Sequence, residues 1–183
     1  QKQLKQLEQM EATVKNQYYA KGHKAKYQFG DILGESMAIQ ETRELAQRFA
    51  NYEANVLLLG ETGTGKELFA QSIHNASLRQ REPFVAVNCG ALPVSLLESE
   101  LFGYVDGAFT GASRKGKKGM LEIADKGTIF LDEISEMDWQ GQAHLLRVLE
   151  EHTITRIGDD KVIQVDVRVI AASNKNLRKL VEG

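Results

Sequence analysis

The stretch Gly60-Glu-Thr-Gly-Thr-Gly-Lys-Glu-Leu68 lies between a short apolar run and a segment with helical periodicity. Its glycines let the backbone turn tightly, so that N–H groups and the start of the following helix can face a phosphate group. Lys66 would add a positive charge. The common motif continues with Ser or Thr, whose hydroxyl ligates Mg²⁺, whereas Glu67 stands here. The predicted nucleotide-binding residues are Gly60, Glu61, Thr62, Gly63, Thr64, Gly65, Lys66 and Glu67.

A pair of carboxylates follows a second apolar run, at Asp132 and Glu133. Because the carboxyl ends of parallel strands meet at one edge of a sheet, both side chains should lie near the glycine-rich loop. We expect Asp132 to hold Mg²⁺, mostly through water, and Glu133 to orient or deprotonate an attacking water. Glu67 would then be free to face elsewhere.

The rest of the chain alternates between strands and helices, which predicts an α/β fold with a parallel sheet covered on both faces. Ser36 can cap the first helix, with Met37, Leu45 and Phe49 available for the core. The predicted strands are 56–59, 84–87, 128–131 and 167–172, and the predicted helices are 36–50, 66–75, 93–101 and 138–150.

Residues 1–28 differ from this domain, being rich in Gln and Lys and free of Pro. The positions Leu4, Leu7, Val14 and Tyr18 fit a and d heptad sites, with Glu11 interrupting at an a site. A solvated linker helix and a dimeric signalling helix remain open. We therefore divide the chain into a linker or signalling helix, 1–28, and an α/β part, 29–183.

Composition narrows the class of protein. The 183 residues carry 23 Lys and Arg against 25 Asp and Glu, so no overall field attracts nucleic acid. The apolar runs are too short to cross a bilayer and no apolar leader is visible, which predicts a cytoplasmic protein without a membrane partner. The single cysteine, Cys89, is expected to be a small buried side chain, and the four histidines show no metal-ligand spacing.

The hexapeptide Gly107-Ala-Phe-Thr-Gly-Ala112 is not typical of a hydrophobic core, because glycines bracket a lone Phe109 and Thr110. From the residues alone, a hairpin tip that tucks Phe109 back onto the domain is favoured over a docking function.

With this hexapeptide the sequence resembles the AAA+ ATPase domain of sigma-54-dependent transcription activators, the bacterial enhancer-binding proteins, over about Gly34 to Gly183. The resemblance implies a three-layer P-loop NTPase fold of the ASCE type, ATP and Mg²⁺ as cofactors, and ATP hydrolysis. The family's phosphate loop also carries Glu after its Lys, so Glu67 is normal there. The residues implied to contact the sigma-54 subunit of RNA polymerase are Gly107, Ala108, Phe109, Thr110, Gly111 and Ala112.

Two asparagines match family positions as well. Asn88, in Val-Asn-Cys-Gly-Ala-Leu, resembles the switch asparagine that pairs with the catalytic glutamate, here Glu133. Asn174 resembles the sensor I asparagine near the γ-phosphate, with Ser173 in place of the commoner threonine.

Two further matches are less complete. Arg156 resembles an arginine of the family, which implies a role between subunits, although Asp159 and Asp160 replace the usual small residues. Tyr104-Val105-Asp106 replaces the family's Glu or His pair before the hexapeptide.

The resemblance also implies parts that lie beyond Gly183: the arginine fingers, the sensor II arginine, the helical lid and the domain through which such proteins bind DNA. Full-length relatives act as hexameric rings. The sheet is then expected to be incomplete at the C-terminus, with four of five strands and with strand 56–59 exposed as an edge.

The leading hypothesis is an ATP-dependent transcription activator domain that remodels the sigma-54 polymerase holoenzyme through the hexapeptide. The alternatives are another AAA+ remodelling ATPase, or a nucleotide-switched binding module without turnover. The pair Asp132 and Glu133 disfavours the last, because a pure switch does not need Glu133.

Overall fold

The computed structural model describes residues 22–108, 110, 112 and 115–175, and at its centre is a parallel sheet. The strands run in the order β1-β8-β5-β2, with parallel pairing throughout. They are β1 (Val56–Leu59), β2 (Phe84–Asn88), β5 (Thr128–Asp132) and β8 (Arg168–Ser173). All four predicted strands are present to within one residue at each end, which confirms the α/β prediction.

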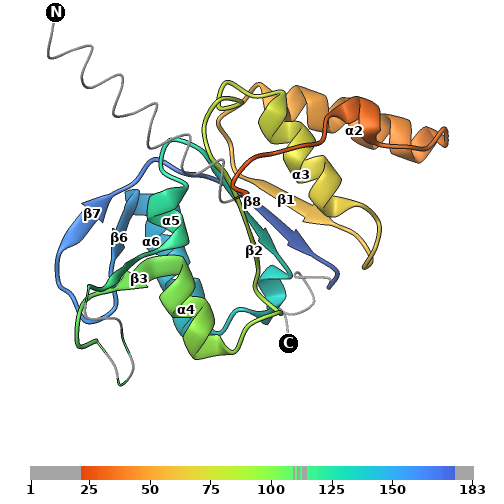
Figure 1. The fold of residues 1–183 in the computed structure, drawn as a ribbon. Coiled ribbons are helices and arrows are strands. Elements are labelled where there is room, and N and C mark those ends of the chain that lie inside the picture. Colours follow the sequence, from red (N-terminus) through yellow and green to blue (C-terminus); the bar gives the residue numbers. More distant parts are fainter. Residues whose placement is uncertain (1–21, 109, 111, 113–114, 176–183) are drawn as a thin grey trace, which may run out of the picture.

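Helices cover both faces of the sheet, so the molecule has three layers (Figure 1). On one face lie α2 (Met37–Ala50) and α3 (Lys66–Asn75); on the other lie α4 (Val94–Phe102), α5 (Met120–Ile123) and α6 (Trp139–Glu151). Two short 3-10 turns, η1 (Phe29–Asp31) and η2 (Ile134–Glu136), complete the described helices.

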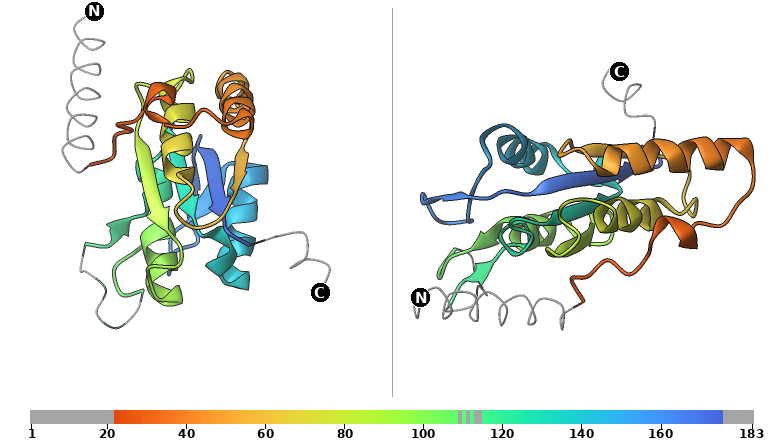
Figure 2. Two further views of the ribbon diagram at one scale, coloured as in Figure 1. Left: turned by 90° about the vertical axis from the view of Figure 1, so that its right-hand side faces the viewer. Right: turned by 90° about the horizontal axis from the view of Figure 1, so that it is seen from above.

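Alternation along the strands divides the core in two. Phe84, Phe130 and Ile170 pack with α2 and α3, whereas their neighbours Val85 and Ile129 pack with α4, α5 and α6. Figure 2 shows the sheet lying between the two sets of helices. Burial on both faces explains the continuous apolar runs of β5 and β8, whereas β1 is partly exposed along its length.

Side-chain caps fix where two of the helices begin. Ser36 accepts a hydrogen bond of 3.4 Å from the N–H of Ile39 at the start of α2. Asp138 accepts one of 3.0 Å from the N–H of Gly141 at the start of α6. Both caps satisfy N–H groups that have no partner within the helix.

The prediction for the apolar side of α2 is wrong. Met37, Leu45 and Phe49 are 76%, 47% and 42% exposed, and the buried residues of the helix are Ala46 and Ala50. The small alanines allow close packing in the core, while Leu45 and Phe49 line a cavity of about 510 Å³ along the edge strand β1. The predicted edge position of β1 is confirmed, because only β8 pairs with it in the described sheet.

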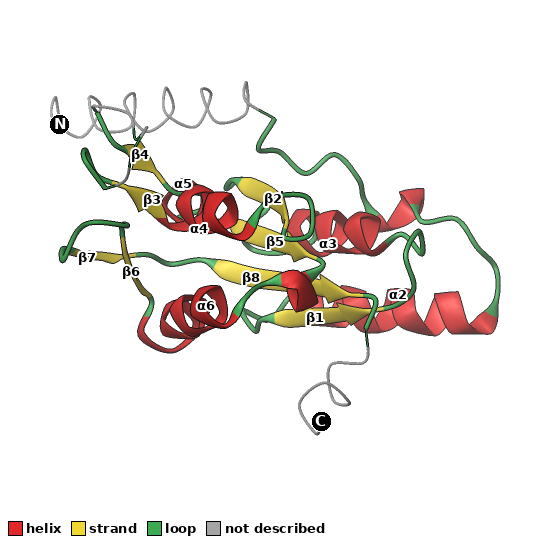
Figure 3. Ribbon diagram, turned by 90° about the horizontal axis from the view of Figure 1, so that it is seen from below, coloured by secondary structure: helices red, strands yellow, loops and turns green. Residues whose placement is uncertain are grey.

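Two small antiparallel pairs lie beyond the main sheet and were not predicted (Figure 3). One joins β3 (Gly103–Tyr104) to β4 (Lys117–Lys118), and the other joins β6 (Thr153–Thr155) to β7 (Val162–Gln164). Strands of two or three residues are too short to show an alternating pattern.

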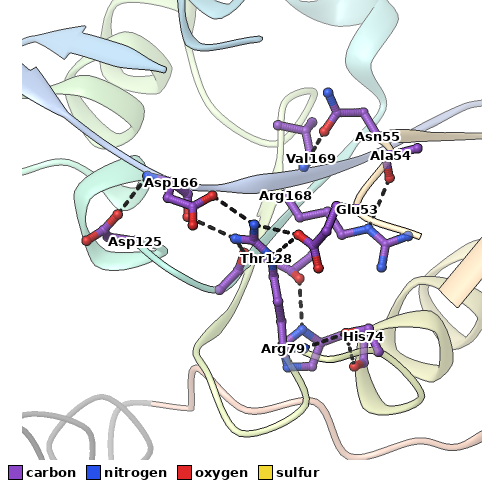
Figure 4. A network of polar contacts seen from close by, with 12 residues as sticks. Glu53, Ala54, Asn55, His74, Arg79, Asp125, Thr128, Asp166, Arg168 and Val169 are labelled. Carbon is purple, nitrogen blue, oxygen red and sulfur yellow. Dashed lines mark hydrogen bonds and ion pairs between the residues drawn. The ribbon is translucent and has the colours of Figure 1, made fainter. Parts of the chain in front are cut away.

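A polar network ties the elements together at the amino ends of the strands (Figure 4). Arg79 contacts Glu53 at 2.6 Å and Asp166 at 2.8 Å, and it also donates to the backbone carbonyl of Gly127 at 3.1 Å. The loops before β1, β5 and β8 are therefore held by one guanidinium group.

Arg168, at the start of β8, is 1% exposed and donates to three carbonyl oxygens: Phe49 at 2.8 Å, Ala50 at 3.2 Å and Ala54 at 3.1 Å. These carbonyls belong to the end of α2 and the turn after it, and that of Phe49 also accepts the N–H of Tyr52 at 3.1 Å. Burial lowers the pKa of Arg168 from its ordinary value. The arginine thus attaches the end of α2 to the sheet.

No helix in the part of the chain that the structure describes is long and apolar enough to cross a membrane.

Candidate functional site

The glycine-rich loop joins β1 to α3 and closes around Lys66. Gly63 and Gly65 have φ angles of +82° and +84°, a region that favours glycine, and Gly65 is the N-cap of α3. The Lys66 ammonium group donates to the carbonyls of Gly60 at 2.8 Å and Glu61 at 2.7 Å. The loop therefore has the shape expected from its sequence, with its one cation held at the start of α3.

The loop and the carboxyl ends of two strands enclose a cavity of about 290 Å³. Its lining consists of Thr62, Gly63, Gly65, Lys66, Glu67, Leu68, Asp132, Glu133 and Asn174. Most of the residues predicted to bind nucleotide, metal or water are therefore brought to one place, from three separate parts of the sequence.

The carboxylates of Asp132 and Glu133 lie at the end of β5. Asp132 Oδ1 accepts the N–H of Glu133 at 2.9 Å, and Glu133 has a left-handed backbone with φ 52° and ψ 45°. A non-glycine residue in this region is uncommon and is often found at functional sites. The turn lets the chain leave the sheet directly after Asp132, so that both acids stay at the sheet edge.

Asn88, at the end of β2, is the parallel neighbour of Asp132. Its Oδ1 accepts the N–H groups of Gly90 at 2.8 Å and Ala91 at 3.1 Å. A Cβ atom built on Gly90 would lie 2.1 Å from Glu133 Oε2 and 3.4 Å from Asn88 Oδ1. The two side chains thus meet at Gly90, a residue that sequence reasoning missed although it lies only two positions after Asn88.

Asn174 follows β8, and its Nδ2 donates to Thr62 Oγ1 at 3.1 Å. This contact joins the loop after β8 to the glycine-rich loop. Sequence reasoning placed both residues in the site but gave no signal that they contact each other.

Cys89 lies behind these residues and is 2% exposed, as predicted. Burial, and then the charges of Asp132 and Glu133, raise the pKa of its thiol to about 12. The thiol therefore stays protonated at neutral pH beside the candidate site.

The chain matches a known protein family. The model of the Sigma-54 interaction domain matches residues 32–183. The chain belongs to this family. The sigma-54 interaction domain and its homologues are transcriptional activators with a P-loop NTPase fold, which agrees with the sheet order and the loop described above.

Individual relatives agree with this assignment. The chain is 58% identical over 158 residues to a signal-transduction and transcriptional-control protein of Clostridium beijerinckii, covering 86% of this chain and 25% of the relative. It is 52% identical over 160 residues to the acetoin dehydrogenase operon transcriptional activator AcoR of Bacillus subtilis, covering 87% and 26%. The chain thus spans about a quarter of the length of these curated relatives.

A solved structure is also similar. NtrX from Brucella abortus, in complex with ATP, superimposes with a TM-score of 0.74 at 34% identity, covering 83% of this chain and 32% of that chain. The likeness supports nucleotide binding by the sigma-54 interaction domain fold.

The hexapeptide lies between β3 and β4, and its stem contacts the β6–β7 region. The N–H of Ile157 donates to the Gly103 carbonyl at 2.9 Å, and the N–H of Val105 donates to the Ile157 carbonyl at 3.1 Å. A Cβ atom on Gly158, whose φ is +80°, would lie 2.9 Å from Ala108 Cβ.

Within the hexapeptide, Gly107 and Thr110 are exposed, while Ala108 and Ala112 are half-buried. The predicted contact residues Phe109 and Gly111 lie outside the described residues, as do residues 1–21 of the predicted linker. None of the described hexapeptide residues lines the nucleotide cavity, and the role of the loop as a contact stays a prediction.

Arg156, predicted to act between subunits, forms an ion pair within the chain. Its Nε and Nη2 donate to the two carboxylate oxygens of Glu122, each at 2.7 Å. The hydrogen bond to Glu122 raises the pKa of Arg156. Nothing in the short segment around Glu122 marked it as the partner, and contact with a neighbouring subunit stays a prediction.

Proposed function

We propose that this chain is the nucleotide-binding part of an ATPase that hydrolyses ATP to remodel the sigma-54 RNA polymerase holoenzyme. The observation that carries the proposal is the single cavity lined by Lys66, Asp132, Glu133 and Asn174. A cation for the phosphates, a metal-binding carboxylate, a base for water and a polar amide are the groups that phosphoryl transfer to water requires.

Lys66 binds the terminal phosphates in this proposal, and its present partners are backbone carbonyls of the loop, which a phosphate can replace. Asn174, which donates to Thr62 Oγ1, contacts the γ-phosphate in this proposal. Glu133 takes the proton of the attacking water.

Asp132 fits a Mg²⁺ ion of the kind that is shared with a nucleotide. Such an ion is bound by one or two carboxylates, water and phosphate oxygens. Asp132 Oδ1 accepts the Glu133 N–H, the second carboxylate oxygen is not used in that bond, and Asp132 lines the cavity. Among the described residues no group of three His, Cys, Asp or Glu could hold a metal by itself, which agrees with a shared ion. Bound Mg²⁺ would neutralise charge on the phosphates.

The hexapeptide is the part that contacts sigma-54. Support comes from the family and from the exposure of Gly107 and Thr110, at a distance in sequence from the cavity. Asn88 and Glu133, which meet at Gly90, form the part that reports the nucleotide to this loop.

A complete ring is needed for fast turnover. An arginine from a neighbouring subunit contributes about 10³ to 10⁵ in rate in related nucleoside triphosphatases. Arg156, which we place at the subunit boundary, is a different residue from this arginine and pairs with Glu122 within the chain. We expect the isolated 183-residue chain to hydrolyse ATP near background. Turnover that rises cooperatively with protein concentration would overturn that expectation.

Nucleotide binding is tested by titrating the chain with Mg²⁺-ATP in a calorimeter. Lys66→Ala should abolish binding, because it removes the charge that faces the phosphates. Lys161→Ala, at an exposed position in the β6–β7 region, is the matched control and should bind like the parent. Equal affinity of the two variants would disprove the phosphate-loop assignment.

Contact with sigma-54 is tested by Thr110→Ala in a protein that carries the complete domain. ATP hydrolysis should stay near the parental rate while sigma-54-dependent promoter opening fails. Promoter opening at the parental level would show that the hexapeptide is not the coupling element.

A further inference from the structure

The segment that precedes the domain is fastened to the helix that follows the phosphate loop. Residues 22–28, which we call the strap, run beside α3 and the start of β2 (Figure 1). The N–H of Phe84 donates to the His23 carbonyl at 3.2 Å, and Ala25 is only 5% exposed in the core with Phe69 and Ile73. The strap is thus a packed part of the domain surface.

Two side chains of α3 hold the strap by its backbone. Gln71 Oε1 accepts the N–H groups of Lys26 at 2.7 Å and Tyr27 at 3.3 Å. Asn75, one helical turn later, donates from Nδ2 to the carbonyls of Ala25 at 3.3 Å and Tyr27 at 2.8 Å. Gln71 is 6% exposed, so its two bonds to the strap are partly buried, whereas the bond from Asn75 to Tyr27 is exposed.

Glu67 sets the orientation of the Gln71 amide. Gln71 Nε2 donates to Glu67 Oε1 at 3.0 Å, which directs the amide oxygen toward the strap. With the amide turned over, its NH₂ group would face the N–H groups of Lys26 and Tyr27, and three donors cannot pair. The strap therefore depends on a carboxylate that directly follows Lys66.

Glu67 also reaches the nucleotide cavity. Among the described residues it is the one that lines both the cavity with Lys66 and Asp132 and a second cavity, of about 390 Å³, under the strap. The three side chains Glu67, Gln71 and Asn75 follow one another at intervals of four residues along one side of α3. The path from the phosphate loop to the strap runs from Glu67 through Gln71, and Asn75 is a separate attachment of the strap.

We propose that the Glu67–Gln71 pair couples nucleotide binding to the docking of the strap, an inference that rests on the proposed binding of ATP at Lys66. The phosphates of a bound nucleotide repel the Glu67 carboxylate and favour its position on Gln71, which holds the Gln71 oxygen on the strap. By thermodynamic reciprocity, a docked strap strengthens nucleotide binding by the same factor. The docking of the strap therefore depends on whether a nucleotide is bound.

The test measures amide hydrogen exchange at Lys26 and Tyr27 in the 183-residue chain, with and without saturating Mg²⁺-ATP, alongside the ATP affinity from calorimetry. ATP should slow exchange at both amides by about fivefold or more, the lower end of usual coupling between sites. In Gln71→Ala, exchange should be fast and no longer respond to ATP, and ATP affinity should fall by the same factor.

Two further variants distinguish loss of the Glu67–Gln71 hydrogen bond from a general weakening of the contacts that hold the strap. Gln71→Glu keeps an oxygen for Lys26 and Tyr27 but removes the donor to Glu67, so the strap should stay protected without responding to ATP. Asn75→Ala loosens the strap without touching Glu67, so exchange should be faster but should still slow on addition of ATP.

The outcomes distinguish this inference from the proposed function. If ATP binds and exchange at Lys26 and Tyr27 does not change, or if Gln71→Glu responds like the parent, the coupling is disproved while nucleotide binding stands. If ATP does not bind to the parental chain, the proposed function fails and the coupling fails with it.

Discussion

The side chain of Asn174 donates a hydrogen bond of 3.1 Å to the hydroxyl group of Thr62, across 112 positions of the sequence. The contact holds the end of β8 against the phosphate loop, and among the described residues that line the cavity Asn174 carries the one side-chain amide. It raises the question of whether Asn174 acts on the nucleotide or only braces the loop.

Asn174→Ala should lower ATP turnover by the complete domain by about 10-fold or more, because a polar donor near the transferred phosphate is lost. Thr62→Val removes only the partner hydroxyl and should lower turnover less. Steady-state rates of both variants decide the matter, and equal losses would mean that Asn174 only braces the loop.

Glu133→Gln should bind ATP with near-parental affinity and lose turnover by at least about 100-fold, since an amide of the same shape cannot take a proton. The matched control is Glu150→Gln on the exposed side of α6. Calorimetry and steady-state assays of the complete domain supply the two readings. Normal hydrolysis by Glu133→Gln would show that the water is activated elsewhere.

Acid should weaken the fold through His74. Its Nδ1 lies 2.8 Å from Thr128 Oγ1, and burial lowers its pKa from 6.5 to about 4. His74 therefore binds a proton below pH 6.5 in the unfolded chain, but only below about pH 4 in the folded chain. The contribution of neutral His74 to the free energy of unfolding is complete above pH 6.5 and is lost as the pH falls toward 4. It amounts to about 3 kcal/mol at most.

His74→Asn keeps a polar group near Thr128 but does not titrate. Urea unfolding of the parent and of this variant at several values between pH 7 and pH 4 should give a smaller fall in the free energy of unfolding for His74→Asn. Parallel curves would refute a contribution from His74.

Arg168→Lys should destabilise the domain by about 2 kcal/mol or more, although the charge is kept. A single ammonium group cannot reach the carbonyls of Phe49, Ala50 and Ala54 together, so buried acceptors lose their partners. Arg147→Lys, at an exposed position of α6, is the control and should leave the urea midpoint unchanged. An equal effect of the two variants would contradict the role of Arg168.

The sequence predicted the sheet and the main helices because their signals are local. Continuous apolar runs mark strands buried on both faces, and Ser36 and Asp138 mark helix starts. The prediction failed for the apolar residues of α2. Leu45 and Phe49 line a cavity beside the edge strand β1, and helical periodicity does not show whether an apolar side chain meets the sheet or lies past its edge.

In the candidate site, motifs predicted which residues gather but not their contacts. The pairs Asn174 with Thr62 and Arg156 with Glu122 join distant segments through the fold. The pair Glu67 and Gln71 is local, but Glu and Gln four residues apart are too common on helices to carry a signal.

The close approach of Gly158 to Ala108 has a mechanical consequence. Because backbone hydrogen bonds join Ile157 to Gly103 and Val105, the foot of the hexapeptide loop and the turn at Gly158 are held against each other. A side chain at position 158 would clash with Ala108 and displace the start of the hexapeptide loop. A substitution outside the hexapeptide would thus reposition its start without altering any of its own residues.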